Sequence, residues 1–173
     1  MKRILLFIFF LTLSLKMNPQ IHIYVEGDCG YYNSAVFCDV LCKCMGKKAI
    51  SRWLEDGIHF GGFYCELDSM GCVKKITHVP LPAQKILSKR KIKKIERYLV
   101  RHRVSFKFCW YFPEMGIDGY TRYLRENFQK NGTITHPTGG FPYFFMWRYK
   151  KEDGLTPYEH LVKEISKYTQ CQE

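Results

Sequence analysis

The sequence predicts an α+β fold: a single compact domain with a small sheet and packed helices, after a hydrophobic N-terminal segment. The 173 residues are 46% hydrophobic and 16% aromatic, which suffices for one core but not comfortably for two. Charged residues make up 25%, and low-complexity tracts are absent, as is typical of a folded chain. The second half alternates strand, helix and strand patterns, which favours an α+β arrangement.

The N-terminal segment, residues 1–16, reads MKRILLFIFFLTLSLK, with two cations before an apolar run. This order matches the first two parts of a secretory signal, although Thr12 and Ser14 offer only a marginal cleavage site. The run is shorter than the roughly 20 residues that span a bilayer. We expect a secreted or membrane-associated protein if the segment is genuine, and a cytoplasmic one if translation starts at Met17. Residues 17–173 are expected to form the α+β domain.

The first half is predicted to contain four elements. They are a strand over residues 21–25, a helix over 35–45, a helix over 49–55 and a strand over 59–67. Ser34 is suited to cap the first helix at its N-terminus, and Gly46 to end it.

The second half is predicted to contain a basic helix and the strongest strands. In order, we expect a helix over 88–103, a strand over 104–112, a helix over 120–129, a loop over 132–140, a strand over 143–149 and a helix over 157–168. The strand over 104–112 is apolar enough to be central in a sheet. Asn131-Gly132-Thr133 is a formal glycosylation sequon, but it is also a turn pattern, and we favour the turn.

The positive charge is concentrated in one segment. The chain has a formal charge of +11 and a pI of about 9.3. Between Lys85 and Arg103, nine basic residues stand against one acid, Glu96, which gives a local charge of +8. Such a patch favours binding to nucleic acid, a sulfated glycan or an anionic membrane surface.

The basic helix has an apolar stripe that would anchor it to the core. Ile92, Ile95, Leu99 and His102 recur at spacings of three and four residues, with Tyr98 beside them. The opposite face supplies the candidate phosphate-binding residues: Lys89, Arg90, Lys91, Lys93, Lys94, Arg97, Arg101 and Arg103, with Arg52 and Arg125 as secondary candidates. Phosphate contacts of this kind give salt-dependent affinity with little sequence information. Aromatic residues such as Trp110 and Phe145 are candidates for stacking on single-stranded bases.

The eight cysteines permit three interpretations. They are Cys29, Cys38, Cys42, Cys44, Cys65, Cys72, Cys109 and Cys171. We favour packing first, because Cys38 and Cys42 share a helix face and Cys109 lies in an aromatic strand. Disulfides come second, because an even count follows a signal-like start. Zinc binding by Cys42, Cys44, Cys65 and Cys72 comes third, because their spacing lacks the paired pattern of a zinc site, and no metal or other cofactor is predicted.

Residues 34–64 have the outline of a helix-turn-helix. The two short helices flank Gly46-Lys47-Lys48, and Arg52 lies in the second. The phrase ISRWLEDG followed by GGFY resembles the nuclease-associated modular repeats found beside homing endonucleases. That resemblance implies a helix that touches DNA and a Gly-aromatic strand packed beneath it.

Residues 103–161 carry a second resemblance. The segments RVSFKFCWYFPE, DGYTRYLRENFQ and PYFFMWRYKKEDGLTPYEHL resemble the replication-associated family of filamentous phages and prophages, whose fold is akin to rolling-circle initiators. In that family paired histidines hold a divalent metal, which activates a DNA phosphate for attack by a tyrosine. Here only His160 is present, Tyr158 stands where the other histidine belongs, and Tyr168 is a conceivable nucleophile. The resemblance therefore implies a shared scaffold rather than a shared activity.

These observations lead to two main hypotheses about function. The first is a nucleic-acid-binding protein of a phage, virus or mobile element. The alternative is a secreted or surface protein with disulfides, without enzymatic activity, whose basic face binds glycans or a host partner. A metal-dependent nicking enzyme is a third hypothesis. No catalytic residue is assigned, and the sequence contains no P-loop, dinucleotide fingerprint or nucleophile elbow.

Overall fold

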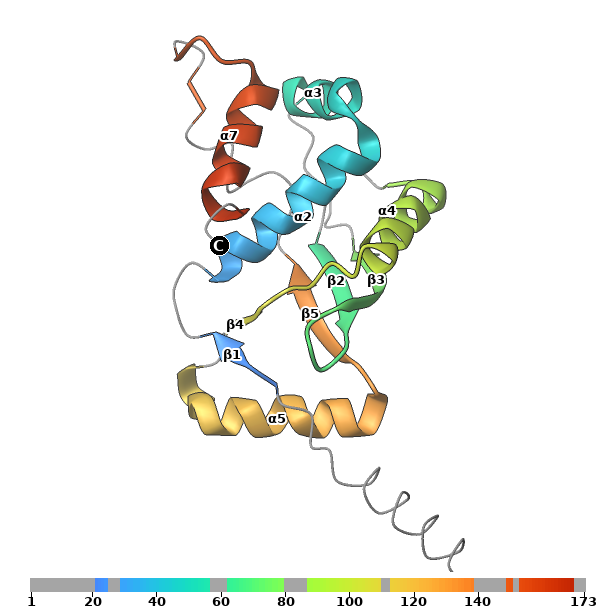
Figure 1. The fold of residues 1–173 in the computed structure, drawn as a ribbon, viewed down its shortest axis with the longest axis vertical. Helices are drawn as coiled ribbons and strands as arrows, with labels where there is room; N and C mark the ends of the chain where they lie inside the picture. Colours follow the sequence, from blue (N-terminus) through green and yellow to red (C-terminus); the bar gives the residue numbers. More distant parts are fainter. Residues whose placement is uncertain are drawn as a thin grey trace, which may run out of the picture.

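The computed structural model describes residues 21–24, 29–56, 62–79, 87–109, 113–138, 149–150 and 153–169. They form a single α+β domain, as predicted. Its elements are β1 (Ile23–Tyr24), α2 (Cys29–Met45), α3 (Lys47–Glu55), β2 (Gly62–Leu67), β3 (Val73–Val79), α4 (Lys89–Arg101), β4 (Phe108–Cys109), the 3₁₀ turn η1 (Pro113–Met115), α5 (Gly116–Asn131), β5 (Ile134–Thr138) and α7 (Pro157–Thr169) (Figure 1).

The main sheet has three antiparallel strands in the order β3-β2-β5. Alternate residues of β2 point into the core, because Phe63, Cys65 and Leu67 are fully buried while Tyr64 is exposed. A separate parallel pair joins β1 to β4, with Ile23 opposite Phe108.

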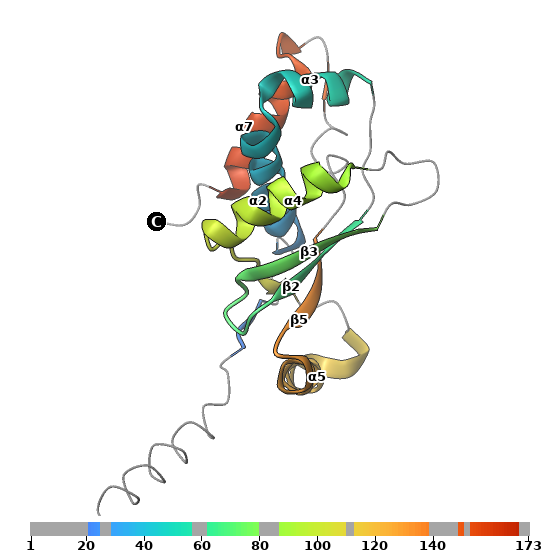
Figure 2. The ribbon, with the colours of Figure 1, turned by 90° about the vertical axis from the view of Figure 1, so that its right-hand side faces the viewer.

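Helix α2 lies at the centre of the core. Its Phe37 ring lies 4.6 Å from the ring of Phe63 on β2 and 6.4 Å from that of Phe106. The same helix contacts α3, α4 and α7. Figures 1 and 2 show α4 beside β3, and α5 across the far end of β5. Within the described ranges, no helix is both long enough and apolar enough to cross a membrane; residues 1–16 lie outside those ranges.

The predicted start of the first long helix is wrong. Helix α2 begins at Cys29, and Ser34 is buried inside it rather than capping it. The local sequence does not indicate the earlier start, because a distant segment stabilises the added residues 29–34. Within them, Asn33 hydrogen-bonds to the backbone of Lys107. The second helix is confirmed as α3, with two more residues at its start.

The prediction of a central strand over 104–112 is also wrong. Among residues 104–109, the part of this range that the structure describes, only Phe108–Cys109 is a strand, and it belongs to the two-stranded pair. After α4 the chain turns left-handed at Arg103 (φ 49°) and bonds to the β2–β3 turn, with Phe106 N–H donating to the Gly71 carbonyl at 2.9 Å. Residues 110–112, and with them Trp110, lie outside the described residues.

The predicted loop over 132–140 contains a strand. β5 pairs with β2, while Gly132 (φ 69°) ends α5 in the turn that the sequence favours. Strand β3 was not predicted, because Lys74 and Lys75 are consecutive exposed residues and break the alternation. The predicted strand over 59–67 appears as β2, with residues 57–61 outside the described ranges.

The last two predicted helices are confirmed as α5 and α7. Tyr120 and Leu124 of α5 are buried, as the spacing indicates. The predicted strand over 143–149, which includes Phe145, lies outside the described residues except for Tyr149, which is in no strand.

Candidate polyanion interface

Helix α4 is held at its start and along one face. Ser88 caps it, with the hydroxyl accepting a hydrogen bond from the Lys91 N–H at 3.4 Å. Ile95 and Leu99 are fully buried in the core. The predicted anchoring role of His102 is wrong: this residue lies beyond the end of α4, is exposed, and places its ring 4.2 Å from that of Tyr98.

The only acidic residue of α4 is turned toward the sheet. Glu96 Oε2 accepts a hydrogen bond from the backbone N–H of Ile76 on β3 at 3.0 Å. This bond fastens the helix to the sheet and keeps the carboxylate on the packed side. The outer face of α4 therefore presents cations without an acid among them.

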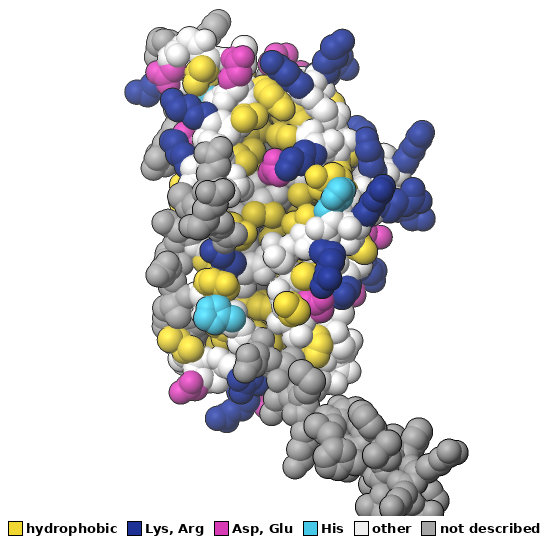
Figure 3. All heavy atoms as spheres, viewed as in Figure 1, with side chains coloured by type: hydrophobic (Ala, Val, Ile, Leu, Met, Phe, Trp, Pro, Cys, Tyr) yellow, Lys and Arg dark blue, Asp and Glu magenta, His cyan; other side chains and the backbone are white. Residues whose placement is uncertain are grey.

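Six of the eight predicted binding residues lie on one side of α4. At about 100° per residue they fall within about 140° of the helix circumference, opposite Ile95 and Leu99, and they extend for roughly 18 Å. We call Lys89, Arg90, Lys93, Lys94, Arg97 and Arg101 the cationic stripe; all six are exposed. Figure 3 shows Lys and Arg side chains crowded along the edge where Figure 1 places α4.

The other predicted binding residues lie away from the stripe. The Lys91 ammonium lies 5.0 Å from the centroid of the Trp53 ring on α3. Arg103 follows the end of α4 in a left-handed conformation. Arg52 is exposed on α3, and Arg125 is exposed on α5, at the far end of the molecule.

Within the described part of the chain, no ion pair compensates the charges of the cationic stripe. The salt bridges among the described residues are Lys43–Asp39, Lys74–Asp68, Lys75–Glu66 and Lys167–Glu164, and none includes a stripe residue. Like charges four residues apart destabilise a helix by about 0.2–0.5 kcal/mol per pair. Cations in a first turn also oppose the helix dipole. The folded protein thus carries a repulsion that a bound anion would relieve.

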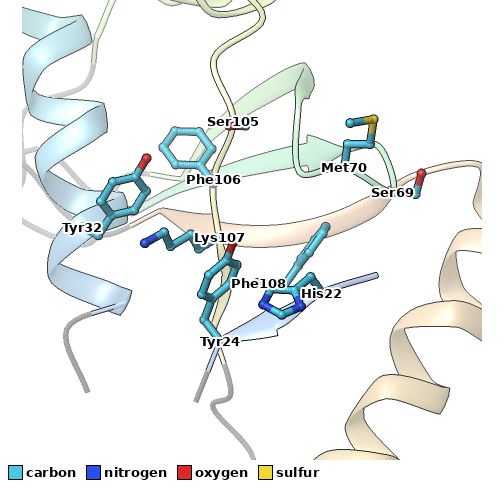
Figure 4. A pocket seen from close by; sticks show the side chains of 9 residues that line it. All are labelled: His22, Tyr24, Tyr32, Ser69, Met70, Ser105, Phe106, Lys107 and Phe108. Carbon is cyan, nitrogen blue, oxygen red and sulfur yellow. The ribbon is translucent and has the colours of Figure 1, made fainter. Parts of the chain in front are cut away.

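A pocket of about 340 Å³ lies at the other end of the segment that leaves α4. The nine described residues that line it, labelled in Figure 4, come from β1 and the residue before it, α2, the β2–β3 turn and residues 105–108. The sequence did not predict this pocket. The one local signal was the run Phe106-Lys107-Phe108, in which a cation alternates with two aromatic rings.

Lys107 is fixed in this pocket by side chain and backbone contacts. Its ammonium lies 4.2 Å from the centroid of the Tyr32 ring and 4.8 Å from that of Tyr24. The buried Asn33 side chain holds its backbone at both ends, donating to the Lys107 carbonyl and accepting from the Lys107 N–H, each at 2.8 Å. The attachment of Lys107 to α2 is therefore rigid.

The interpretation of Cys109 as a free packing thiol is wrong. Cys109 forms a disulfide with Cys29, which joins β4 to the start of α2 close to Asn33. The pairing links residues 80 positions apart, so spacing along the chain gave no sign of it. The described cysteines outside this disulfide are Cys38, Cys42, Cys44, Cys65 and Cys72, and Cys171 lies outside the described residues.

The described residues do not support the alternative of a metal site. Nowhere in these ranges do three His, Cys, Asp or Glu side chains gather as metal ligands would. This finding contradicts zinc binding by the four cysteines considered above. His160 is buried with its ring 5.4 Å from that of Tyr149, and Tyr168 stacks on Tyr31, so both residues pack against aromatic neighbours.

The free thiols of α2 are expected to react slowly. Burial, reinforced by Asp39 and opposed by Lys43, raises the pKa of Cys42 to about 12, and burial raises the pKa of Cys38 and of Cys44. At pH 8 a thiol with a pKa of about 12 is ionised to only about one part in 10⁴, against roughly a quarter for an ordinary thiol. Iodoacetamide labelling followed by peptide mass analysis should show slow modification of these three in the native protein and fast modification in urea. Equal rates in both would contradict this assignment.

Gly71 is expected to be intolerant of any side chain. It has φ 79°, and a Cβ there would lie 2.2 Å from the Phe106 carbonyl oxygen. Gly71→Ala should cost about 2–3 kcal/mol in the free energy of unfolding, measured in urea. Gly154→Ala is the matched control, because Gly154 has φ 72° but open space around it. Equal losses for the two variants would show that the contact with Phe106 contributes nothing.

Comparison with models of known protein families, with curated proteins and with solved structures finds no match for this chain. The resemblances of residues 34–64 and 103–161 therefore stay predictions.

Proposed function

We propose that this protein binds nucleic acid through the cationic stripe of α4. The observation that carries the proposal is that six exposed cations share one helix face, while the acid of that helix is engaged with β3. A phosphate backbone supplies regularly spaced negative charges, and binding gains from the release of its counterions. That the protein comes from a phage, virus or mobile element is a prediction that rests on the two sequence resemblances alone.

A solvated helix face without function explains the stripe less well. Surface charge usually mixes both signs, which limits repulsion. Here the cations repeat at four-residue intervals, as in Lys89, Lys93, Arg97 and Arg101. The packing of Ile95 and Leu99 offsets the resulting repulsion, so the helix presents a fixed electrostatic surface rather than a basic tail.

The neighbouring aromatic pocket favours a single strand over a duplex. The segment after α4 runs across one face of the molecule to β4 (Figure 1), and its residues 105–108 line the pocket. Proteins that bind single strands combine a positive track for the backbone with aromatic rings on which bases stack. The stripe and the pocket supply these two parts.

The disulfide favours a second candidate function. Disulfides persist in oxidising compartments, and residues 1–16 resemble a secretory signal. A secreted, non-enzymatic protein would offer the same stripe to a sulfated glycan or to a host partner.

A side-by-side binding measurement distinguishes the two candidates. Gel shifts at one salt concentration should be run with single-stranded DNA, single-stranded RNA, duplex DNA and heparin. If the protein binds nucleic acid as proposed, single-stranded DNA or RNA should bind more tightly than duplex DNA or heparin of equal charge. Binding of heparin alone would overturn it in favour of the glycan candidate. The mass of the protein purified from secreting cells adds an independent test, since export would remove the N-terminal segment.

A further inference from the structure

We propose that the pocket around Lys107 binds one nucleotide unit, with the base against the aromatic walls and the phosphate on the lysine ammonium. The source of that nucleotide, a strand running along α4, rests on the proposed function. The pocket itself rests on separate observations.

The charge of the residues lining the pocket favours an anionic ligand. Lys107 is half-buried, and none of the nine described residues that line the pocket is acidic. The four salt bridges of the described residues do not include Lys107. Its ammonium contacts the faces of Tyr24 and Tyr32, which partly desolvate the charge without neutralising it. A charge in that state gains more from an anionic partner than one in open water.

The aromatic side chains that line the pocket can stack on a flat ring such as a nucleobase. Figure 4 shows Tyr32 on one side of Lys107 and Tyr24 on the other, with Phe108 and His22 close to Tyr24. Tyr24 is 36% exposed, so part of this residue is open to solvent beside Lys107. Aromatic faces of this kind bind bases of any sequence, since every base has a stacking surface.

The size and polar groups of the pocket suit a single nucleotide. Ligand pockets range from about 300 to 1,000 Å³. A pocket of about 340 Å³ is at the small end, which fits one nucleotide and is too small for a dinucleotide cofactor. Ser69 and Ser105 line it and offer hydroxyls for phosphate oxygens or a base edge.

The pocket is held in place by bonds within the protein. The two hydrogen bonds from Asn33 fix the Lys107 backbone, and the Cys29–Cys109 disulfide holds α2 to β4. The contact of Gly71 with Phe106 sets the opposite rim. Little ordering is needed on binding, which favours measurable affinity for a small ligand.

The test uses isolated ligands on the full chain. NMR titrations should be run with a nucleoside 5′-monophosphate, the corresponding nucleoside, and N-acetylglucosamine 6-sulfate as the glycan arm. We expect Lys107→Gln to weaken monophosphate binding at least about tenfold and to leave nucleoside binding within about twofold. Tyr32→Leu should weaken both. Lys130→Gln, an exposed cation at the end of α5, is the matched control and should change neither.

The outcomes separate this proposal from the proposed function. Replacement of four stripe residues should weaken polymer binding on the order of 100-fold and leave monophosphate binding unchanged. Polymer binding without monophosphate binding overturns the pocket proposal alone. Monophosphate binding without polymer binding supports the pocket and overturns the function assigned to the stripe. Binding of the sulfated sugar instead of the nucleotide overturns the nucleotide assignment.

Discussion

Replacing Lys89, Arg90, Lys93 and Lys94 by glutamine is expected to weaken single-strand binding on the order of 100-fold at about 0.15 M salt. Each phosphate contact contributes about 0.7 to the slope of log affinity against log salt. Four lost contacts flatten that slope by about 2.8, which at 0.15 M corresponds to this loss of affinity. Fluorescence anisotropy with a labelled oligonucleotide across a salt series measures both quantities.

A second quadruple variant controls for net charge. It replaces exposed cations on α3, α5 and α7, and so removes the same charge from other surfaces: Lys48, Arg122, Lys130 and Lys163. Its salt slope should stay close to that of the wild type. Equal losses in both variants would mean that total charge, rather than the stripe, drives binding. Thermal melting checks the fold, and the stripe variant should melt no lower than the wild type, because helical repulsion is removed.

Reduction of the disulfide is expected to destabilise the protein by about 4 kcal/mol. Cys29 and Cys109 are 80 residues apart, and closing so long a loop restricts the unfolded chain strongly. For a domain of this size such a loss lowers the melting temperature by roughly 10 °C. Calorimetry with and without a reductant measures the shift.

The double variant Cys29→Ser/Cys109→Ser provides the matched control. Its melting temperature should equal that of the reduced wild type and should not respond to the reductant. If the reductant still lowered the melting temperature of the variant, the effect would come from the other cysteines and not from this disulfide. An unchanged wild-type melting temperature under full reduction would contradict a stabilising role for this disulfide.

The helices could be predicted because their signals are local. Ser88 caps α4, and Ile95 and Leu99 recur at helical spacing, so both the start and the buried face follow from neighbouring residues. The charge segregation on α4 was visible for the same reason. The hydrogen bond from the Ile76 N–H on β3 to Glu96 could not be predicted, because the two residues are 20 positions apart in the sequence.

The strands were harder to predict because their partners decide them. Residues 132–140 were predicted to form a loop, yet they contain β5. Within the described residues β5 is an edge strand, where Pro137, which lacks an N–H, is tolerated. The apolar run after α4 suggested a central strand, but Phe106 and Phe108 are buried at the pocket and Cys109 in the disulfide. Apolarity thus indicated burial correctly without indicating sheet position.

Lysine footprinting tests most directly whether α4 contacts the polyanion. The native protein is acetylated briefly with and without a saturating single-stranded oligonucleotide, and each lysine is quantified by peptide mass analysis. Bound oligonucleotide should protect Lys89, Lys93 and Lys94 severalfold and leave Lys130 and Lys163 unchanged. Protection confined to Lys130 or Lys163, with α4 labelled as in the free protein, would contradict the assignment of the cationic stripe.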